Sequence, residues 1–211
     1  MKIAVIGAGN VGAALAGRWS ALGHEVVLGA QDPASEKARA TAASLGLTVS
    51  SLPEAAGQAD VVLLATPGDV VIQAAQGCGD LTGKILVDAT NPLNPQLSGL
   101  NHPEGLSSAQ RLAMAIPGAR VVKAFNTIGF GIMADPVLDG RRSVLFLSGD
   151  DREAVDQVST LARETGFEPV VLGGLPTSRM QEEHALLWIH LSAKAGLGRD
   201  FAFSLVRRVA P

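Results

Sequence analysis

The 211-residue sequence contains one cysteine, Cys78, and no tyrosine, and aromatic residues make up only 4% of it. A single cysteine excludes an intrachain disulfide framework and suits a reducing compartment. We interpret Cys78 as a small buried apolar residue rather than a reactive thiol. Charged residues are also scarce, at 18%, and the net charge of −3 leaves no basic surplus for a nucleic-acid partner.

Long apolar runs are missing as well. No segment approaches the roughly 20 apolar residues that a membrane helix needs. Residues 1–12 are apolar, but Gly7, Gly9 and Gly12 interrupt them and no signal-peptide cleavage pattern follows. The sequence also has no Cys-x-x-Cys, His-x-x-x-His or Ser-His-Asp order, so it offers no metal site and no hydrolytic triad. We therefore expect a cytoplasmic protein that binds neither a membrane nor nucleic acid.

Short β-branched runs alternate with alanine-rich amphipathic segments, a pattern typical of a parallel sheet covered by helices. It predicts an α/β fold: a Rossmann-type, doubly wound, mostly parallel sheet in residues 1–175 with a small helical appendage in 176–211. The expected strands are 2–6, 25–28, 47–49, 60–65, 85–88, 121–125, 143–147 and 169–172. The expected helices are 11–22, 33–45, 53–58, 69–75, 106–116, 152–165 and 179–195.

The first predicted strand leads directly into a glycine-rich turn with the G-x-G-x-x-G spacing of a dinucleotide-binding motif. Gly7 permits the tight turn, and Gly9 lets the backbone approach a pyrophosphate. Gly12 allows the helix to pack closely on the strand. The amino terminus of that helix offers free N–H groups to phosphates. The turn therefore predicts NAD(P) binding by Gly7, Gly9, Asn10, Val11 and Gly12.

The end of the second strand commonly reports which dinucleotide is bound, because an acidic residue there holds the ribose hydroxyls of NAD. Here the strand is followed by Ala30 and Gln31, which neither repel nor strongly attract a 2′-phosphate. Asp32 could bind a ribose hydroxyl or cap a helix that begins at Pro33. These residues alone leave the choice between NADP and NAD open.

Polar loops follow three further strands of the predicted sheet. Ligands collect beyond the carboxyl ends of the strands in an open parallel sheet, so neutral side chains there could hold a ribose and a nicotinamide carboxamide. Asn-Pro and Thr-Pro are also ordinary turn formers, but three such loops at consecutive strand ends favour a site. The predicted contacts are Ala65, Thr66, Pro67, Asn91, Pro92, Asn126 and Thr127.

Acid–base groups are few in the sequence. His24 precedes the second strand and His102 lies in a long loop, while His184 and His190 fall on different faces of the last helix and cannot form a metal pair. No catalytic residue can be assigned. Hydride transfer between two cofactors, which needs no proton donor from the protein, fits this scarcity.

These segments resemble the deazaflavin-dependent NADP reductases, the family of NADP oxidoreductases that use coenzyme F420, and the related metal-reductase domains of STEAP proteins. The resemblance lies in residues 2–12, 65–67, 88–92, 121–127 and 143–151, and its most specific part is Lys-Ala-Phe-Asn-Thr at 123–127. It implies an NAD(P)H-dependent oxidoreductase that transfers hydride between a nicotinamide and a deazaflavin, F420, or a flavin-like acceptor. It also implies a homodimer built through the carboxy-terminal segment.

One departure from the family concerns the cofactor. The family usually has Gly-Ser-Arg where this chain has Gly29, Ala30 and Gln31, and the serine and arginine hold the 2′-phosphate of NADP. We therefore expect a weakened preference for NADP, with NAD as a further possibility. Two alternative functions stay open. One is a small imine or hydroxyacid reductase, although those families have a longer helical domain, and the other is a non-catalytic NAD(P)-binding sensor.

Overall fold

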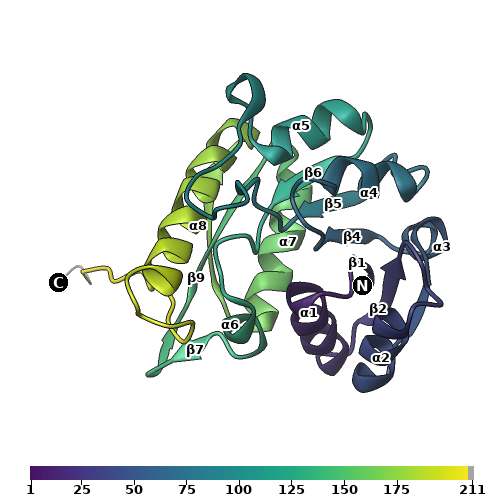
Figure 1. The fold of residues 1–211 in the computed structure, drawn as a ribbon, viewed down its shortest axis with the longest axis horizontal. Coiled ribbons are helices and arrows are strands. Elements are labelled where there is room, and N and C mark those ends of the chain that lie inside the picture. Colours follow the sequence, from purple (N-terminus) through teal and green to yellow (C-terminus); the bar gives the residue numbers. More distant parts are fainter. Residues whose placement is uncertain (209–211) are drawn as a thin grey trace.

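The computed structural model, which describes residues 1–208, contains one eight-stranded sheet with helices on both faces (Figure 1). The strands follow the spatial order β10-β9-β6-β5-β4-β1-β2-β3. Their bounds are β1 Lys2–Ile6, β2 Glu25–Ala30, β3 Thr48–Ser51, β4 Val61–Leu64, β5 Ile85–Asp88, β6 Arg120–Lys123, β9 Val144–Gly149 and β10 Glu168–Gly173. A separate hairpin pairs β7 (Val137–Leu138) with β8 (Arg141–Arg142).

The helices cover this sheet in two layers. They are α1 Asn10–Ala21, α2 Glu36–Leu45, α3 Leu52–Gly57, α4 Val71–Gly77, α5 Ser108–Ala115, α6 Phe130–Ala134, α7 Arg152–Thr165 and α8 Ser178–Ala193, with 3-10 turns at Pro103–Gly105 and Leu175–Thr177. Across residues 1–208, none of these helices combines the length and the hydropathy needed to cross a membrane.

The sheet is mostly parallel, which confirms the predicted Rossmann-type class. Strands β1 to β6 all pair in parallel, and only β9 runs antiparallel to its neighbour β6. The chain leaves β1 toward β2 on one side and returns to pair β4 on its other side. The loops after β1 and β4 therefore diverge, and such a switch point is where open α/β sheets bind ligands.

Alternate side chains of β1 belong to two different cores. Ile3 and Val5 pack with Trp19 of α1 and with α7, whereas Ala4 and Ile6 pack with α3, α4 and α5. A strand buried on both faces needs the continuous apolar sequence that β1 has. Two covered faces thus fix the strand registers and, with them, the positions of the loops at the strand ends.

Three predicted helix starts are wrong, and one of them is the helix expected from residue 106, which begins at Ser108 after its N-cap Ser107. The helix expected from residue 33 begins at Glu36, because Asp32 forms a turn in which its Oδ1 accepts from the Ala34 N–H at 3.0 Å. Ser35, rather than Asp32, caps the helix by accepting from the backbone N–H of Ala38. The helix expected from residue 69 begins at Val71.

Other differences lie around the end of β6. The strand expected at 121–125 ends at Lys123, and Phe125 has a left-handed φ of 63°. The short helix α6 and the β7–β8 hairpin were not predicted. Cys78 is buried as expected, and burial raises the pKa of its thiol to about 11.

The last helix extends the fold beside β9, against which it packs (Figure 1). The chain then folds back along it. The indole N–H of Trp188 donates to the carbonyl of Phe201 at 3.1 Å, and the two rings stack with centroids 5.2 Å apart. The backbone N–H of Val144 donates to the carbonyl of Phe203 at 2.8 Å. Residues 199–203 are thereby attached both to α8 and to the sheet.

Candidate functional site

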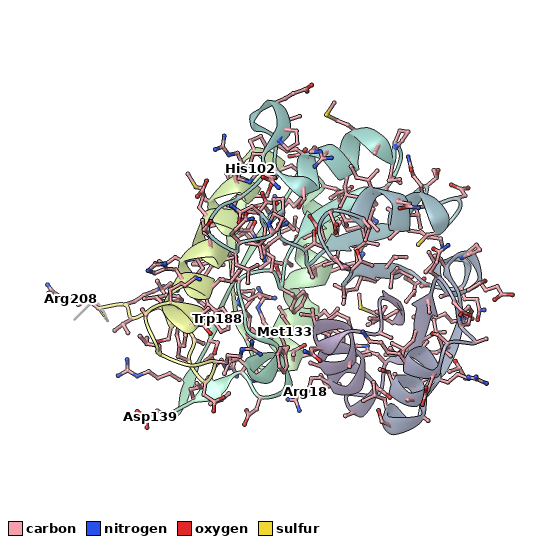
Figure 2. All side chains as sticks on the ribbon, in the orientation of Figure 1. Arg18, His102, Met133, Asp139, Trp188 and Arg208 are labelled. Carbon is pink, nitrogen blue, oxygen red and sulfur yellow. The ribbon has the colours of Figure 1, made fainter. Side chains whose placement is uncertain are left out.

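Two large cavities adjoin at the carboxyl ends of the central strands. The glycine-turn cavity, about 830 Å³, is lined by the loops after β1, β2 and β4. The apolar cavity, about 700 Å³, is lined by the loops after β5 and β6 and by α6 and α8; Met133 and Trp188, labelled in Figure 2, belong to its lining. Val11 and Phe130 line both. A ligand in one cavity can therefore reach a ligand in the other.

The three glycines of the turn have different structural requirements. Gly7 has a φ of 117°, and a Cβ there would lie 2.6 Å from the carbonyl oxygen of Ala65. At Gly12 a Cβ would lie 2.0 Å from the Gly7 carbonyl oxygen, so the packing of α1 on β1 excludes any side chain. A Cβ at Gly9 would meet nothing within 4 Å. Gly7 and Gly12 are thus needed by the fold, and Gly9 leaves open space in the cavity.

The amino terminus of α1 faces this open space. Its N-cap is Gly9, and no side chain accepts from the N–H groups of its first turn. No acidic residue lies in that turn. The free N–H groups and the positive end of the helix dipole make this point of the cavity suitable for an anion.

The far end of the glycine-turn cavity carries a cation that the sequence analysis missed. Ala30 and Gln31, for which the sequence predicts cofactor binding, line the cavity together with Ser35 and Lys37 of the loop and first turn of α2. Lys37 makes no ion pair within residues 1–208. Its ammonium could have been found by searching beyond the strand end into the following helix for a basic residue.

Two buried hydroxyls at the strand ends have no hydrogen-bond partner in the described chain. Thr66, with Ala65 and Pro67, lines the glycine-turn cavity, whereas Thr127 lines the apolar cavity. Neither Oγ1 has a partner among residues 1–208. Both oxygens are buried, and Ser50, Ser159 and Gln181, which line neither cavity, carry unpaired oxygens as well, so the missing partner does not by itself indicate a ligand.

The predicted asparagines lie on the apolar cavity and are bonded to each other. Asn91 donates through Nδ2 to the Asn126 carbonyl at 2.8 Å, and Asn126 donates through Nδ2 to Asn91 Oδ1 at 3.0 Å. Gln181 of α8 donates to Asn126 Oδ1 at 3.3 Å. Pro92 lines neither cavity; its carbonyl accepts from the N–H of Asn101 at 2.7 Å and anchors the loop.

A strained backbone turns the chain from β6 into the site. Phe125 is fully buried in a left-handed conformation, with its ring edge-on to Trp19 at 5.5 Å and to Phe167 at 6.1 Å. A non-glycine residue in this region costs on the order of 1–3 kcal/mol and persists where the surroundings hold it. The packed rings hold Phe125 there, and the turn directs Asn126 and Thr127 onto the apolar cavity.

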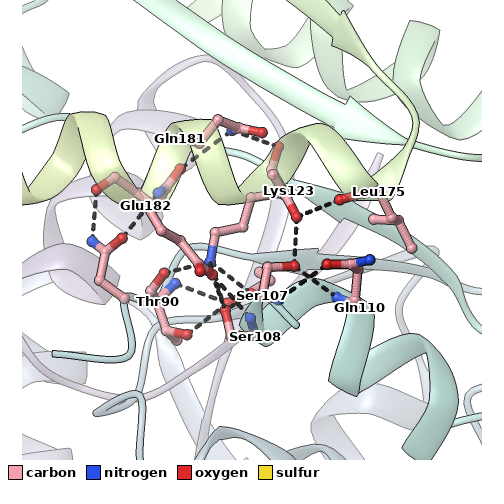
Figure 3. Close-up of polar contacts among 12 residues, drawn as sticks. Thr90, Ser107, Ser108, Gln110, Lys123, Leu175, Gln181 and Glu182 are labelled. Atoms are coloured by element: carbon pink, nitrogen blue, oxygen red, sulfur yellow. Dashed lines mark hydrogen bonds and ion pairs between the residues drawn. The ribbon is translucent and has the colours of Figure 1, made fainter. Parts of the chain in front are cut away.

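A buried charge cluster lies behind the asparagines, and the sequence analysis did not find it. Asp88 of β5, Lys123 of β6 and Glu182 of α8 meet without solvent exposure, and Figure 3 shows Lys123 and Glu182 among their partners. His102 Nε2 lies 2.7 Å from Glu182 Oε2 at the edge of the cluster. None of these four side chains lines either cavity. Among residues 1–208 no group of histidine, cysteine and acidic side chains has a metal-binding arrangement.

Comparison with known proteins places these features in a family. Residues 2–92 match the model of the family described as NADP oxidoreductase coenzyme F420-dependent. The F420-dependent NADP reductase of Methanothermobacter thermautotrophicus (strain Delta H) is 31% identical, over 92% of this chain and 90% of that protein. A crystal structure from Arthrobacter sp. FB24, provisionally assigned as an F420-dependent NADP reductase, is 33% identical with a TM-score of 0.89, covering 98% of this chain and 100% of the other.

A mammalian protein shows a partial similarity. Metalloreductase STEAP3 of Rattus norvegicus is 34% identical over 86% of this chain, but the match covers 36% of STEAP3. The chain therefore spans about a third of the length of that relative.

Proposed function

The chain belongs to the family of coenzyme F420-dependent NADP oxidoreductases, and on this basis we propose that it transfers hydride between a nicotinamide dinucleotide and a deazaflavin or flavin-like acceptor. The observation that supports this most is the junction of the two cavities at Val11 and Phe130. Hydride transfer requires two planar reactants in contact, each held by its own site. Two adjoining cavities, one at the glycine turn and one lined by Trp188, meet that requirement.

The glycine-turn cavity is the proposed dinucleotide site. The residues fit the group: Gly9 leaves space for a pyrophosphate, and the α1 amino terminus offers it N–H donors. Ala65, Thr66 and Pro67 form the wall of this cavity at the end of β4. When bound, the dinucleotide supplies a hydride at C4 of its nicotinamide ring. The protein's part is to hold and orient that ring and to exclude water.

We propose NADP as the preferred dinucleotide, with NAD accepted less well. Lys37 supplies a cation near the end of β2, and Ser35 and Gln31 add neutral donors. Asp32, the one acid in this loop, has Oδ1 engaged by the Ala34 N–H. A single ammonium gives a weaker, less directional phosphate site than an arginine fork, so we expect modest discrimination.

The apolar cavity is the proposed acceptor site. Trp188 forms part of its wall and is held rigid by stacking on Phe201 and by its hydrogen bond to the Phe201 carbonyl. Phe130 and Ile128 add apolar wall, and Asn91 and Asn126 add polar side chains. Such a lining suits a planar ring with polar edges. Arg199 and Asp200, from the segment after α8, add one charge of each sign to this wall.

We further propose that residues 1–175 act as the dinucleotide-binding unit and that 176–211 completes the acceptor wall and forms a homodimer. Within that segment, residues 209–211 lie outside the described chain. Met180 and Leu187 of α8 are exposed, as is Val171 of the edge strand β10. An edge strand and exposed apolar side chains are each features that suit pairing with a second copy.

The test is a panel of acceptors against both nicotinamides. Purified protein is mixed with NADPH or NADH and with a deazaflavin, a flavin nucleotide or a ferric chelate, and oxidation of the nicotinamide is followed at its absorbance band. We expect the deazaflavin or a flavin to be reduced, faster with NADPH. Tight NADPH binding without reduction of any acceptor would instead favour a nucleotide sensor.

A further inference from the structure

The buried charge cluster is bonded far more completely than an ordinary ion pair. The Lys123 ammonium lies 2.9 Å from Asp88 Oδ2, 2.8 Å from Glu182 Oε1, 2.7 Å from Ser108 Oγ and 2.6 Å from the Thr90 carbonyl oxygen. Four acceptors therefore surround a group with three protons. Figure 3 shows these contacts converging from β6, α5, α8 and the loop after β5.

Every carboxylate oxygen of the cluster is occupied. Asp88 Oδ1 accepts from the Thr90 N–H at 2.9 Å and the Thr90 hydroxyl at 2.7 Å. Glu182 Oε1 also accepts from the Ser108 N–H at 3.0 Å, and Glu182 Oε2 lies 2.7 Å from His102 Nε2. A network satisfied this fully has one geometry, so it fixes the relative positions of the elements that contribute to it.

Stability alone is a poor reason for such a cluster. Charges lose several kcal/mol of hydration each when they are buried, and well-packed apolar side chains of similar volume commonly stabilise a protein as much or more. A buried ion cluster does specify a unique arrangement, because any slip leaves a charge without its partner. The function of the cluster is therefore better explained as fixing the positions of the residues next to it.

Each charged residue of the cluster lies just before residues of the apolar cavity. Asp88 precedes Ala89, Lys123 precedes the segment 125–129, and Glu182 lies one turn before Ala185 on the same helix. The Lys123–Thr90 contact holds the peptide that leads directly to Asn91.

Gln181, the neighbour of Glu182, connects the cluster to Asn126. Gln181, adjacent to Glu182, donates to the Lys123 carbonyl at 3.2 Å, to Asn126 Oδ1 at 3.3 Å and to the Phe146 carbonyl at 2.9 Å. Asn91 and Asn126 then bond to each other at the cavity surface. Gln181, joined to Glu182 by the backbone, thus connects the main chain of Lys123 to the bonded amide pair.

We propose that Lys123, Asp88 and Glu182 are positioning residues that fix the Asn91–Asn126 amide pair for hydride transfer. None of the three touches a cavity, so they act through the pair and not on a ligand. His102 adds a tether: its contact with Glu182 ties the loop that carries Leu93 and Leu97, two residues of the apolar cavity, to α8. The kinetic part of the proposal rests on the proposed function.

The main test uses a charge-free cluster, the triple variant Asp88→Asn, Lys123→Met, Glu182→Gln. Because no uncompensated charge is left, we expect it to fold and melt close to wild type. It should bind NADPH within about twofold of wild type, since the glycine-turn cavity is untouched, while kcat falls by about tenfold or more.

His102→Gln is a milder change at the edge of the cluster. It should raise the KM for the acceptor by about three- to tenfold and leave the NADPH affinity unchanged. Glu183→Gln, an exposed neighbour on α8, is the matched control and should behave as wild type.

A second readout does not depend on any acceptor. Side-chain amide hydrogen exchange of Asn91 and Asn126, followed by NMR, should be slow in wild type and in Glu183→Gln and at least about tenfold faster in the triple variant. This readout tests the positioning even if no acceptor is reduced, in which case only the proposed function fails. Unchanged exchange in the triple variant and in His102→Gln would overturn the proposal. So would a variant whose kcat, NADPH affinity and folded fraction all fall together, because the cluster would then be purely structural.

Discussion

At the scale of single residues, different glycines of the turn serve folding and binding. Gly12 packs against the Gly7 carbonyl, whereas Gly9 faces empty space. We predict that Gly9→Asp folds normally but loses NADPH binding, because a carboxylate would lie where the pyrophosphate is expected. Gly12→Ala should instead lower the melting temperature. Thermal melting and fluorescence titration with NADPH distinguish the two effects, and unchanged NADPH affinity in Gly9→Asp would contradict the assignment of this cavity.

Cofactor choice is also decided by single residues, at the end of β2. Lys37→Ala should weaken NADPH binding by about tenfold and leave NADH binding unchanged, because only NADPH carries the 2′-phosphate.

The double change Ala30→Ser, Gln31→Arg should strengthen NADPH binding by about 1.5–3 kcal/mol, or roughly ten- to a hundredfold. Calorimetry with both nicotinamides measures this. Arg39→Ala, which removes a cation of α2 that does not line the cavity, is the control. A change in NADH affinity with no change in NADPH affinity would refute the placement of the 2′-phosphate site at the end of β2.

At the scale of helices and strands, the sequence predicted regular elements well and their irregular ends poorly. The β1–turn–α1 unit and the two-sided burial of the strands follow from local pattern, because apolar periodicity reports burial directly. The left-handed Phe125 could not be predicted, since its conformation is held by Trp19 and Phe167, which are distant in sequence. The start of α2 depended on whether Asp32 or Ser35 provides the cap, and both are good capping residues.

The site was predicted unevenly for the same reason. Most residues at the strand ends line one of the two cavities, because parallel strands bring their carboxyl ends to one edge. The charge cluster was missed because Asp88, Lys123 and Glu182 lie far apart in the chain, and each alone resembles a surface charge. A lysine that ends an apolar strand and a glutamate that follows a glutamine on an apolar helix were its only local signals.

The packing of α8 onto the carboxy-terminal segment gives an element-scale prediction. His184 lies between the rings of Phe146 and Phe203, with centroids 5.1 and 4.6 Å away, and burial lowers the pKa of its imidazole below the usual 6.5. The unfolded chain therefore takes up a proton near pH 6.5 that the folded chain resists. This contribution to stability is complete above that pH and is lost as the pH falls below it.

Replacing the imidazole should remove that pH dependence. In His184→Phe the urea midpoint should fall less between pH 7.5 and 5.5 than it does in wild type. His190→Gln, an exposed position on the same helix, serves as the control and should keep the wild-type slope. An unchanged slope in His184→Phe would mean that the imidazole is protonated in the folded protein.

At the scale of the whole molecule, the order of the strands determines where the two cavities form and which surface stays exposed for a partner. The switch point between β1 and β4 positions the glycine-turn cavity, and α6, α8 and the segment after α8 line the apolar cavity. The edge strand β10 and the exposed Met180 and Leu187 remain uncovered.

We predict a homodimer through this surface. Light scattering at micromolar concentration should give about twice the chain mass, because exposed apolar side chains favour burial in a partner. Leu187→Asp together with Met180→Asp should shift the protein to monomer while preserving its far-ultraviolet dichroism. Leu22→Asp, an exposed apolar position outside α8 and β10, should leave the mass unchanged. A wild-type mass equal to one chain would show that this surface does not self-associate.

The central claim is direct hydride transfer between ligands in the two adjoining cavities. The most direct measurement uses NADPH carrying deuterium stereospecifically at C4, a deazaflavin acceptor, ordinary water and mass spectrometry of the reduced product. The acceptor carbon forms a C–D bond that does not exchange, so direct transfer predicts one deuterium in each reduced deazaflavin from one of the two C4 epimers and none from the other. Reduced deazaflavin free of deuterium with both epimers would contradict direct transfer.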